Sequence, residues 1–294
     1  MDKTVSQASI GTRARSREPF WQSEGLLRVL KHLLLSGLGM MFLFPFAWLV
    51  LSSLKTPAEI ASMPPAFFPK KIQWENYSTA VTYIPFFKYL TNTLTIFVGK
   101  AVGAVISCSL AAYGFSRIEW PGRDSVFVLV LSTMMLPVQV TMIPLYIIFD
   151  RLDWIGTYYP LIVPSWFAYA FAIFMLRQFF RTIPMELSEA AYIDGCSEFR
   201  IYWQIILPLA RPALATLVLF EFMWTWNDFF GPLLYLNDQT RWTLSLGLLQ
   251  FRSQRETLWE LLMAASALTT LPSVILYFFG QKTFIQGIAT TGFR

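Results

Sequence analysis

The sequence predicts an all-α polytopic membrane protein with six transmembrane helices. Of its 294 residues, 55% are hydrophobic and only 14% are charged, whereas soluble domains carry about 25% charged residues. Several apolar stretches reach the roughly 20 residues that a helix needs to cross a bilayer. In such a protein the net charge of +5 reflects Lys and Arg gathered on the cytoplasmic side, and it does not indicate a nucleic-acid-binding surface.

The predicted helices belong to a single transmembrane domain. Residues 1–31 are polar and basic, show no signal-peptide cleavage site, and are expected to form a cytoplasmic tail. Residues 32–280 hold the transmembrane domain, and residues 281–294 form a second cytoplasmic tail. The helices are predicted at residues 33–54, 89–113, 125–149, 158–176, 209–227 and 259–279.

The positions of the basic residues predict the orientation. An even number of helices places both termini on one side of the membrane. Most of the 23 Lys and Arg residues lie on the side of the termini and of the segment 181–208. Because Lys and Arg are enriched in cytoplasmic loops, both termini and this segment are expected in the cytoplasm.

The charged segment 181–208 has the pattern of a short helix, a tight turn and a second helix. Pro184 suits a first helical turn, and Glu186 and Glu189 suit the positive end of the helix dipole. Gly195 stands where a helix would end in a left-handed cap. The second helix is expected to begin at Ser197 and to end before Pro208. From the pattern alone, the segment is either an ordinary interfacial loop or a helix presented at a membrane surface.

The residues of this segment carry a more specific signal. Glu189-Ala190-Ala191, then Gly195 after three residues, and Ile205 and Leu207-Pro208 beyond it, resemble the EAA loop of binding-protein-dependent ABC import permeases. The sequences SSLKTPAEI at 52–60, AAYGFSRIEWPGR at 111–123 and WND at 226–228 are similar to the carbohydrate-uptake branch. Within this branch, the chain resembles the smaller, six-helix permease of maltose-type transporters.

This resemblance implies the transmembrane domain of a type I ABC importer in the bacterial inner membrane. Its partners would be a second permease, two ATP-binding subunits, a periplasmic or lipid-anchored solute-binding protein and membrane lipid, with no nucleic acid. The ATPase-coupling residues would be Glu189, Ala190, Ala191, Asp194, Gly195, Leu207 and Pro208. The chain is not expected to be an enzyme, to bind a metal or to bind a cofactor, since ATP and Mg would sit on the partners. In agreement, it lacks the phosphate-binding motif G-x-x-x-x-G-K-[ST].

Polar residues inside the predicted helices are candidates for the solute pathway. Lys100 would cost roughly 2.5–3.5 kcal/mol at mid-membrane, so it requires a partner, and Glu221 is the nearest candidate. Trp224, Trp226 and Asn227, with Asp228, are expected to form a cluster. It is either an aromatic belt at the membrane interface or the lining of a path for a polar, ring-shaped solute. Separately, the pair Gly99 and Gly103 suits close helix contact.

Two other functions remain open at this stage. An ion-coupled secondary transporter would use Lys100 and Glu221, but its halves should repeat in hydropathy, and no clear repeat is visible. A membrane enzyme would need a catalytic set that the sequence lacks. The substrate is open too, because the basic outer segments suit either an acidic oligosaccharide such as alginate or the acidic surface of a binding protein.

Overall fold

The computed structural model describes residues 24–252 and 257–292, and the chain divides after Leu49 into two compact units. The first unit holds most of α1 (Glu24–Ser53). This helix begins before the predicted residue 33, because the preceding Leu, Arg and Lys residues are good helix formers. Its membrane-length apolar part is Leu27–Ser53. The first 23 residues of the predicted tail lie outside the described part of the chain.

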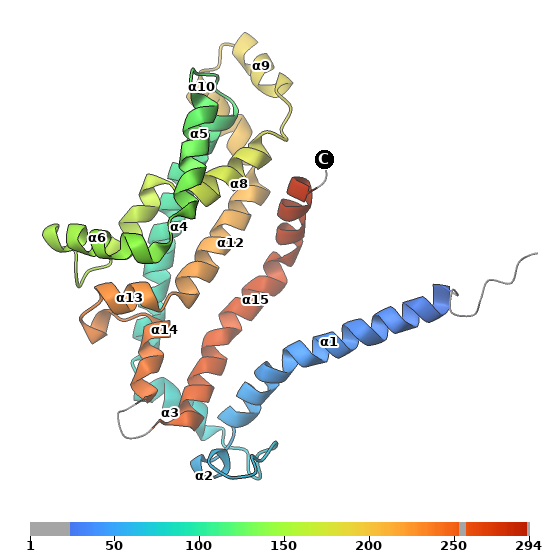
Figure 1. Cartoon of the computed structure of the whole chain (residues 1–294), viewed down its shortest axis with the longest axis vertical. Coiled ribbons are helices and arrows are strands. Elements are labelled where there is room, and N and C mark those ends of the chain that lie inside the picture. Colours follow the sequence, from blue (N-terminus) through green and yellow to red (C-terminus); the bar gives the residue numbers. More distant parts are fainter. Residues whose placement is uncertain (1–23, 253–256, 293–294) are drawn as a thin grey trace, which may run out of the picture. The chain divides into compact units, whose positions relative to one another are not determined.

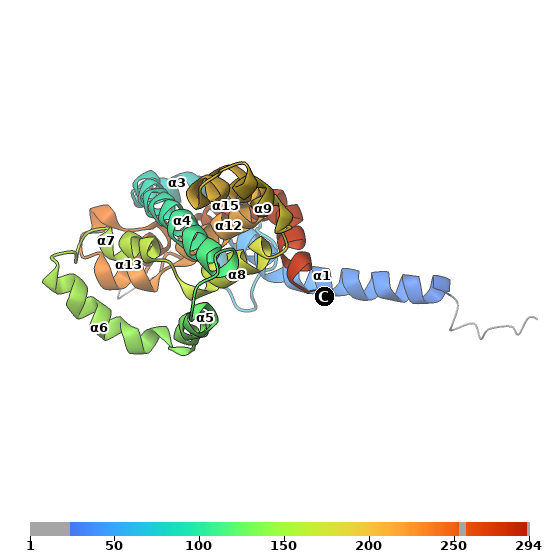
Figure 2. The same ribbon diagram turned by 90° about the horizontal axis from the view of Figure 1, so that it is seen from above.

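The second unit is built on four long helices, which are α4 (Phe86–Ser116), α8 (Ala170–Phe180), α12 (Arg211–Asn227) and α15 (Trp259–Gly292). Helix α4 packs against α8 and α12, and α12 packs against α15 (Figures 1 and 2). Two hydrophobic clusters fill the contacts, one around α4 and α8 and one around α4, α12 and α15. Helix α15 continues through most of the predicted carboxyl-terminal tail, since no proline interrupts this stretch after Pro272.

The segment predicted as one helix over residues 125–149 is not continuous. It forms α5 (Arg123–Ser132), the 3₁₀ turn η2 (Thr133–Met135) and α6 (Val138–Arg151), and the two arms bend by 95°. Pro137 at the bend lacks an N–H group and disfavours helical geometry at Leu136. Helix α6 therefore leaves the α4–α12–α15 group sideways (Figure 2), as half of a broken span or of a re-entrant loop.

Two further predicted helices, the one at residues 158–176 and the second helix of the 181–208 loop, are also subdivided, whereas the helix predicted at 209–227 forms α12 without a break. The helix at 158–176 comprises α7 (Tyr159–Ile162), η3 (Val163–Phe167) and α8. Before α12 come α10 (Glu198–Ile201), the π-helical turn η4 (Tyr202–Ile206) and α11 (Leu207–Leu209), bent by 76° from α12. Helix α11 runs through Pro208, which we expected to follow the helix end. Among the described residues, four helices can cross a membrane, or up to six if each bent pair counts as one span.

Short elements occupy the end of the second unit opposite α9 (Glu186–Ile193), and Figure 1 shows α2, α3 and α14 there. These elements are α2 (Pro57–Ile60), α3 (Glu75–Tyr83), η5 (Gln239–Arg241), α14 (Leu244–Gly247) and η6 (Leu248–Phe251). Helix α13 (Phe230–Tyr235) lies beside α7. Asn92 of α4 donates hydrogen bonds of 3.0 and 2.8 Å to the carbonyls of Thr240 and Trp242. The segment before α14 is thereby fixed to α4.

The glycine pair of α4 receives η3, in the close contact that the sequence indicated. Trp166 donates a 3.1 Å hydrogen bond from Nε1 to the carbonyl of Gly99. A Cβ atom on Gly103 would lie 2.4 Å from the Trp166 ring. A Cβ atom on Gly99 would lie 2.9 Å from the Ile162 side chain of α7. The absence of side chains at both glycines therefore allows α7 and η3 to approach the α4 backbone.

We expect Gly103→Ala to destabilise the protein by about 1–3 kcal/mol, because the new methyl group forces the Trp166 ring or the α4 backbone to move. The measurement is the thermal unfolding midpoint of the detergent-solubilised chain. Gly114→Ala is the matched control in the same helix, since nothing lies within 4 Å of its added Cβ. Equal midpoints for the two variants would contradict the packing argument.

Candidate functional site

The predicted helix and turn of the segment 181–208 are present. Helix α9 carries Glu186 and Glu189 in its first turn. Gly195 has φ +77°, and the N–H of Cys196 bonds back to the Ala191 carbonyl at 2.9 Å. This is the left-handed cap expected from the glycine. Helices α9 and α10 lie together at one end of the second unit (Figure 1).

The coupling residues predicted in this loop divide into exposed and inward-facing groups. The exposed ones are Glu189, Ala190, Asp194, Gly195 and Pro208, whereas Ala191 is buried and Leu207 is half-buried. Ala191 and Leu207 pack into the cluster around α4 and α8. The exposed residues are therefore available to a partner, and the inward-facing ones fix the shape of the loop.

Large apolar side chains, which the sequence analysis did not single out, surround these exposed residues. Ile193 is 88% exposed, Phe199 66% and Trp203 61%, and Leu187 and Tyr192 are exposed as well. We call these five residues the loop apolar surface. An exposed apolar group of this kind marks an interaction site. The signal was present in the sequence as apolar residues that lie off the inward stripe of α9 and α10.

Glu198 joins the loop to α4. Its carboxylate accepts a 2.5 Å hydrogen bond from the hydroxyl of Tyr113 in α4 and another from the hydroxyl of Tyr192 in α9. Partial burial, together with the hydrogen bond and charge of Glu198, raises the pKa of Tyr192 to about 12. Tyr192 therefore stays protonated and keeps donating throughout the physiological pH range.

Two buried arginines connect the ends of α4 and α8, and each donates hydrogen bonds to backbone carbonyls at or just after the end of the other helix. Arg117, after α4, donates from Nη2 to the carbonyls of Phe180 and Ile183 at 2.6 and 2.5 Å. Arg177 of α8 donates from Nε to the Phe115 carbonyl of α4 at 3.0 Å. Arginine near a helix C-terminus satisfies the last carbonyls and interacts favourably with the helix dipole. This arginine pair fixes the helix that leads into α9 to the end of α4.

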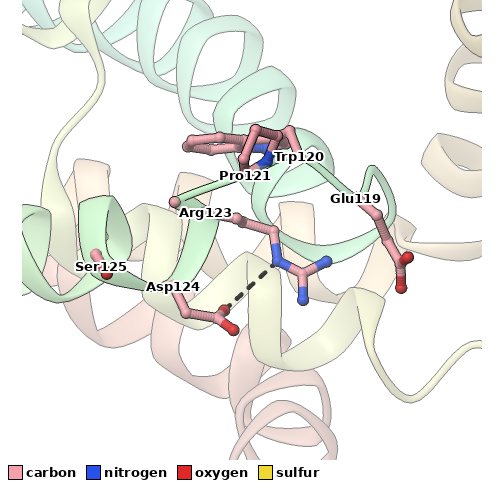
Figure 3. Close-up of a pocket in the computed structure, with 7 residues that line it drawn as sticks. Glu119, Trp120, Pro121, Arg123, Asp124 and Ser125 are labelled. Atoms are coloured by element: carbon pink, nitrogen blue, oxygen red, sulfur yellow. Dashed lines mark ion pairs between the residues drawn. The ribbon is translucent and has the colours of Figure 1, made fainter.

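The turn between α4 and α5 completes this framework. Asp124 accepts a 3.2 Å hydrogen bond from Arg177, and its Oδ1 lies 3.5 Å from the Nε of Arg123, the ion pair drawn as a dashed line in Figure 3. The turn surrounds an open hollow of 540 Å³. Of its charged lining, Asp124 is therefore already engaged in holding α5 against α8.

The structure brings together the two charges that we expected to pair within the membrane. The Nζ atom of Lys100 lies 3.9 Å from Oε2 of Glu221. Glu221 is 2% exposed and accepts a 2.7 Å hydrogen bond on Oε1 from the hydroxyl of Tyr169. Helices α4, α8 and α12 with η3 thus meet around one buried carboxylate.

The cluster expected from Trp224, Trp226 and Asn227 does not form as one group. Trp226 is buried, stacks on Phe222, and donates from Nε1 to the Thr269 carbonyl at 2.9 Å. Trp224 is 44% exposed and packs against Phe171 instead. At 3.6 residues per turn, positions two apart lie on nearly opposite faces of a helix. The prediction of a single cluster is therefore wrong.

A cavity of 260 Å³, with five Ser and Thr residues in its wall, lies between α12, α14 with η6, and α15. Among the predicted pathway residues, Trp226 and Asn227 line it, while Trp224, Lys100 and Glu221 do not. The remaining wall is formed by Met223, Ser245, Leu248, Ser266, Thr269, Thr270 and Ser273. The sequence analysis missed these hydroxyl residues, because single Ser and Thr residues are common in apolar helices.

The described chain thus combines membrane-length helices, an exposed loop at one end and a cavity between helices, an arrangement typical of a membrane transport subunit. The chain belongs to the family of inner membrane components of binding-protein-dependent transport systems, whose model matches residues 103–290. The match contains the loop 181–208, the arginine pair and all residues of the cavity.

Individual relatives cover most of the chain. It is 32% identical to the arabinooligosaccharides transport system permease protein AraQ of Bacillus subtilis (strain 168), over 87% of this chain and 92% of AraQ. It is 30% identical to the diacetylchitobiose uptake system permease protein NgcG of Streptomyces coelicolor, over 92% and 91%. In fold it is similar to a bacterial ABC transporter involved in the import of the acidic polysaccharide alginate, with TM-score 0.79, 23% identity, and coverage of 90% of this chain and 99% of the other.

Proposed function

We propose that this chain is a permease subunit of an ATP-driven importer of a sugar or oligosaccharide, and that it forms half of the translocation pathway with a second permease. The observation that carries this proposal is the rigid, exposed loop 181–208 in a chain with no phosphate-binding motif. The relatives AraQ, a permease of arabinooligosaccharides transport, and NgcG, a permease of diacetylchitobiose uptake, support the substrate class.

The partners follow from this function. Two ATP-binding subunits would carry ATP and Mg, and a solute-binding protein would deliver the substrate. The family description names a binding protein. A similar solved chain, with TM-score 0.65 and 17% identity, belongs to an alginate ABC transporter in complex with an alginate pentasaccharide-bound periplasmic protein.

The loop surface would seat in a groove of an ATP-binding subunit. Glu189 would pair there with a basic residue, but an exposed ion pair contributes only about 0–1 kcal/mol. Reversing a two-state equilibrium from 1:99 to 99:1 takes about 5.5 kcal/mol. Most of the coupling free energy therefore comes from the loop apolar surface and from the rigid cap at Gly195.

This function sets the orientation in the bacterial inner membrane. The loop must face the cytoplasm to reach an ATPase, and the basic residues beside it agree with that side. Helix α15 runs toward the end of the second unit that carries α9 (Figure 1), which supports a cytoplasmic carboxyl terminus. With an even number of spans, the amino terminus lies on the same side.

The test is a double variant of the loop, Glu189→Ala with Gly195→Pro. Proline holds φ near −65° and cannot adopt the +77° of the cap. When the tagged chain is co-expressed with its partner subunits, we expect an ATP-binding subunit to co-purify with it. The double variant should reduce both co-purification and ATP-dependent oligosaccharide uptake in proteoliposomes by about tenfold or more, equivalent to about 1.4 kcal/mol of binding free energy.

Glu75→Ala is the control, since Glu75 is an exposed first-turn glutamate in α3 at the opposite end of the unit. It should leave co-purification and uptake unchanged. An ion-coupled secondary transporter would bring down no ATPase and would take up solute without ATP. Normal uptake by an assembled double variant would refute the proposed coupling.

A further inference from the structure

We propose that the cavity between α12, α14 and α15 is a solute site that accepts neutral, hydroxyl-rich sugars and disfavours sugars that carry a carboxylate. The inference rests on the proposed function and narrows its substrate class. The cavity measures 260 Å³, close to the lower end of the roughly 300–1,000 Å³ of small-molecule pockets. This chain therefore supplies room on the order of one sugar unit.

Among the described residues, the wall of the cavity carries no charged side chain. Its lining comprises two apolar residues, one tryptophan, one asparagine and five hydroxyl residues. The nearest charged neighbour in sequence is Asp228, whose carboxylate already accepts a hydrogen bond of 2.9 Å from the N–H of Gly231. Nothing in this lining offers a positive charge to an anionic solute.

Several hydrogen-bond donors of the wall are used within the protein. Thr269 and Thr270 donate their hydroxyl hydrogens to carbonyls one turn earlier in α15, both at 2.8 Å. Ser245 donates to the Asp228 carbonyl at 2.6 Å, and Asn227 donates from Nδ2 to the Met223 carbonyl at 2.7 Å. The indole N–H of Trp226 is likewise given to Thr269.

These bonds leave the wall rich in acceptors. A hydroxyl oxygen that has donated its hydrogen keeps two lone pairs, and the asparagine side chain keeps its carbonyl oxygen. Sugar hydroxyls can donate to such oxygens. An ionised carboxylate is an acceptor only, and the described lining offers it no counter-charge. Burial in this cavity is therefore unfavourable for a desolvated anion.

The basic outer segments suit either an acidic oligosaccharide or an acidic surface of the binding protein, and a neutral substrate favours the second role. A neutral substrate has no need of Lys70, Lys71 or Arg241 along its path. Those cations are then free to meet an acidic surface of the solute-binding protein. The fold is shared with an alginate importer, but the chemistry of this cavity points to a different charge class of sugar.

The experiment uses the complete importer, with partner permease, ATP-binding subunits and binding protein, in proteoliposomes. Two probe mixtures are supplied, partial hydrolysates of neutral polysaccharides (starch and arabinan) and of uronate polysaccharides (alginate and polygalacturonate). Mass spectrometry identifies what accumulates with ATP. We expect neutral oligosaccharides to accumulate at least tenfold faster than uronates. Uronate uptake at a comparable rate would overturn the cavity proposal alone, whereas no uptake from either mixture would overturn the proposed function with it.

Because the binding protein also selects solutes, a variant assigns selectivity to the cavity. Thr270→Val keeps the shape of the side chain and removes one acceptor oxygen, and we expect at least a fivefold loss of neutral-sugar uptake with unchanged co-purification of the ATPase. Thr95→Val is the matched control, since Thr95 is an exposed threonine of α4 with the same backbone bond, 2.8 Å to the Thr91 carbonyl. Equal uptake by both variants would overturn the assignment.

Discussion

Arg117→Met is expected to uncouple ATP hydrolysis from solute uptake in the assembled importer. The variant removes the guanidinium that holds the carbonyls of Phe180 and Ile183. The Phe180 carbonyl keeps the N–H of Ile183 at 3.2 Å, so the loss falls on the Ile183 carbonyl, and a buried carbonyl that loses its donor costs about 1–3 kcal/mol. The segment leading into α9 then loses its fixed position against α4. Movement of α9 by the ATPase would then deform this segment and would no longer carry α4 and α8 with it.

The expected readout is a fall of about tenfold in uptake per ATP hydrolysed, with the ATP-binding subunits still attached. Arg117→Lys should give an intermediate value, because an ammonium group is a point charge and cannot reproduce the planar guanidinium fork. Arg181→Met is the control, since Arg181 lies in the same segment and is exposed. If uptake and hydrolysis fall by the same factor in Arg117→Met, the residue supports assembly and does not transmit motion.

The features predicted from sequence were those set by local chemistry or by the membrane. Gly195 could be placed in a left-handed cap because glycine adopts positive φ without steric cost. Lys100 required a partner because an unpaired charge in lipid is costly, and Glu221 is close to it in the structure. The predicted role of this pair in the pathway stays a prediction.

The features that escaped prediction depend on packing between distant segments. Pro137 lies inside the segment predicted as one helix over residues 125–149. A proline can cause a mild kink of about 20° or a sharp bend such as the 95° seen here, depending on what covers the freed backbone groups. The arginine pair joins residues about 60 positions apart. The cavity combines three segments, and no local pattern marks Ser245 or Thr270 as neighbours of Asn227.

Glu221→Leu is expected to have the largest effect on stability of any single change considered. It leaves the Lys100 ammonium without its carboxylate and removes the acceptor for the Tyr169 hydroxyl. Breaking one partner of a buried ion pair costs about 3–5 kcal/mol. Because the side chain of Lys100 is 20% exposed and keeps some contact with its surroundings, we expect the lower end of that range. The measurement is the thermal unfolding midpoint and the yield of folded protein.

The double variant Lys100→Met with Glu221→Leu should recover the part of this loss that comes from the unpaired charge, because replacing both charges by apolar groups of similar size is often neutral or stabilising. The Tyr169 hydroxyl stays without its acceptor in the single and in the double variant. The same variant separates the two transport mechanisms. In an ATP-driven importer the ion pair only holds α4 against α12. A double variant that folds should therefore retain ATP-dependent uptake. A proton- or sodium-coupled transporter would need the carboxylate to bind and release its ion. A stable double variant with no uptake would therefore contradict a purely structural role for the pair and favour ion coupling.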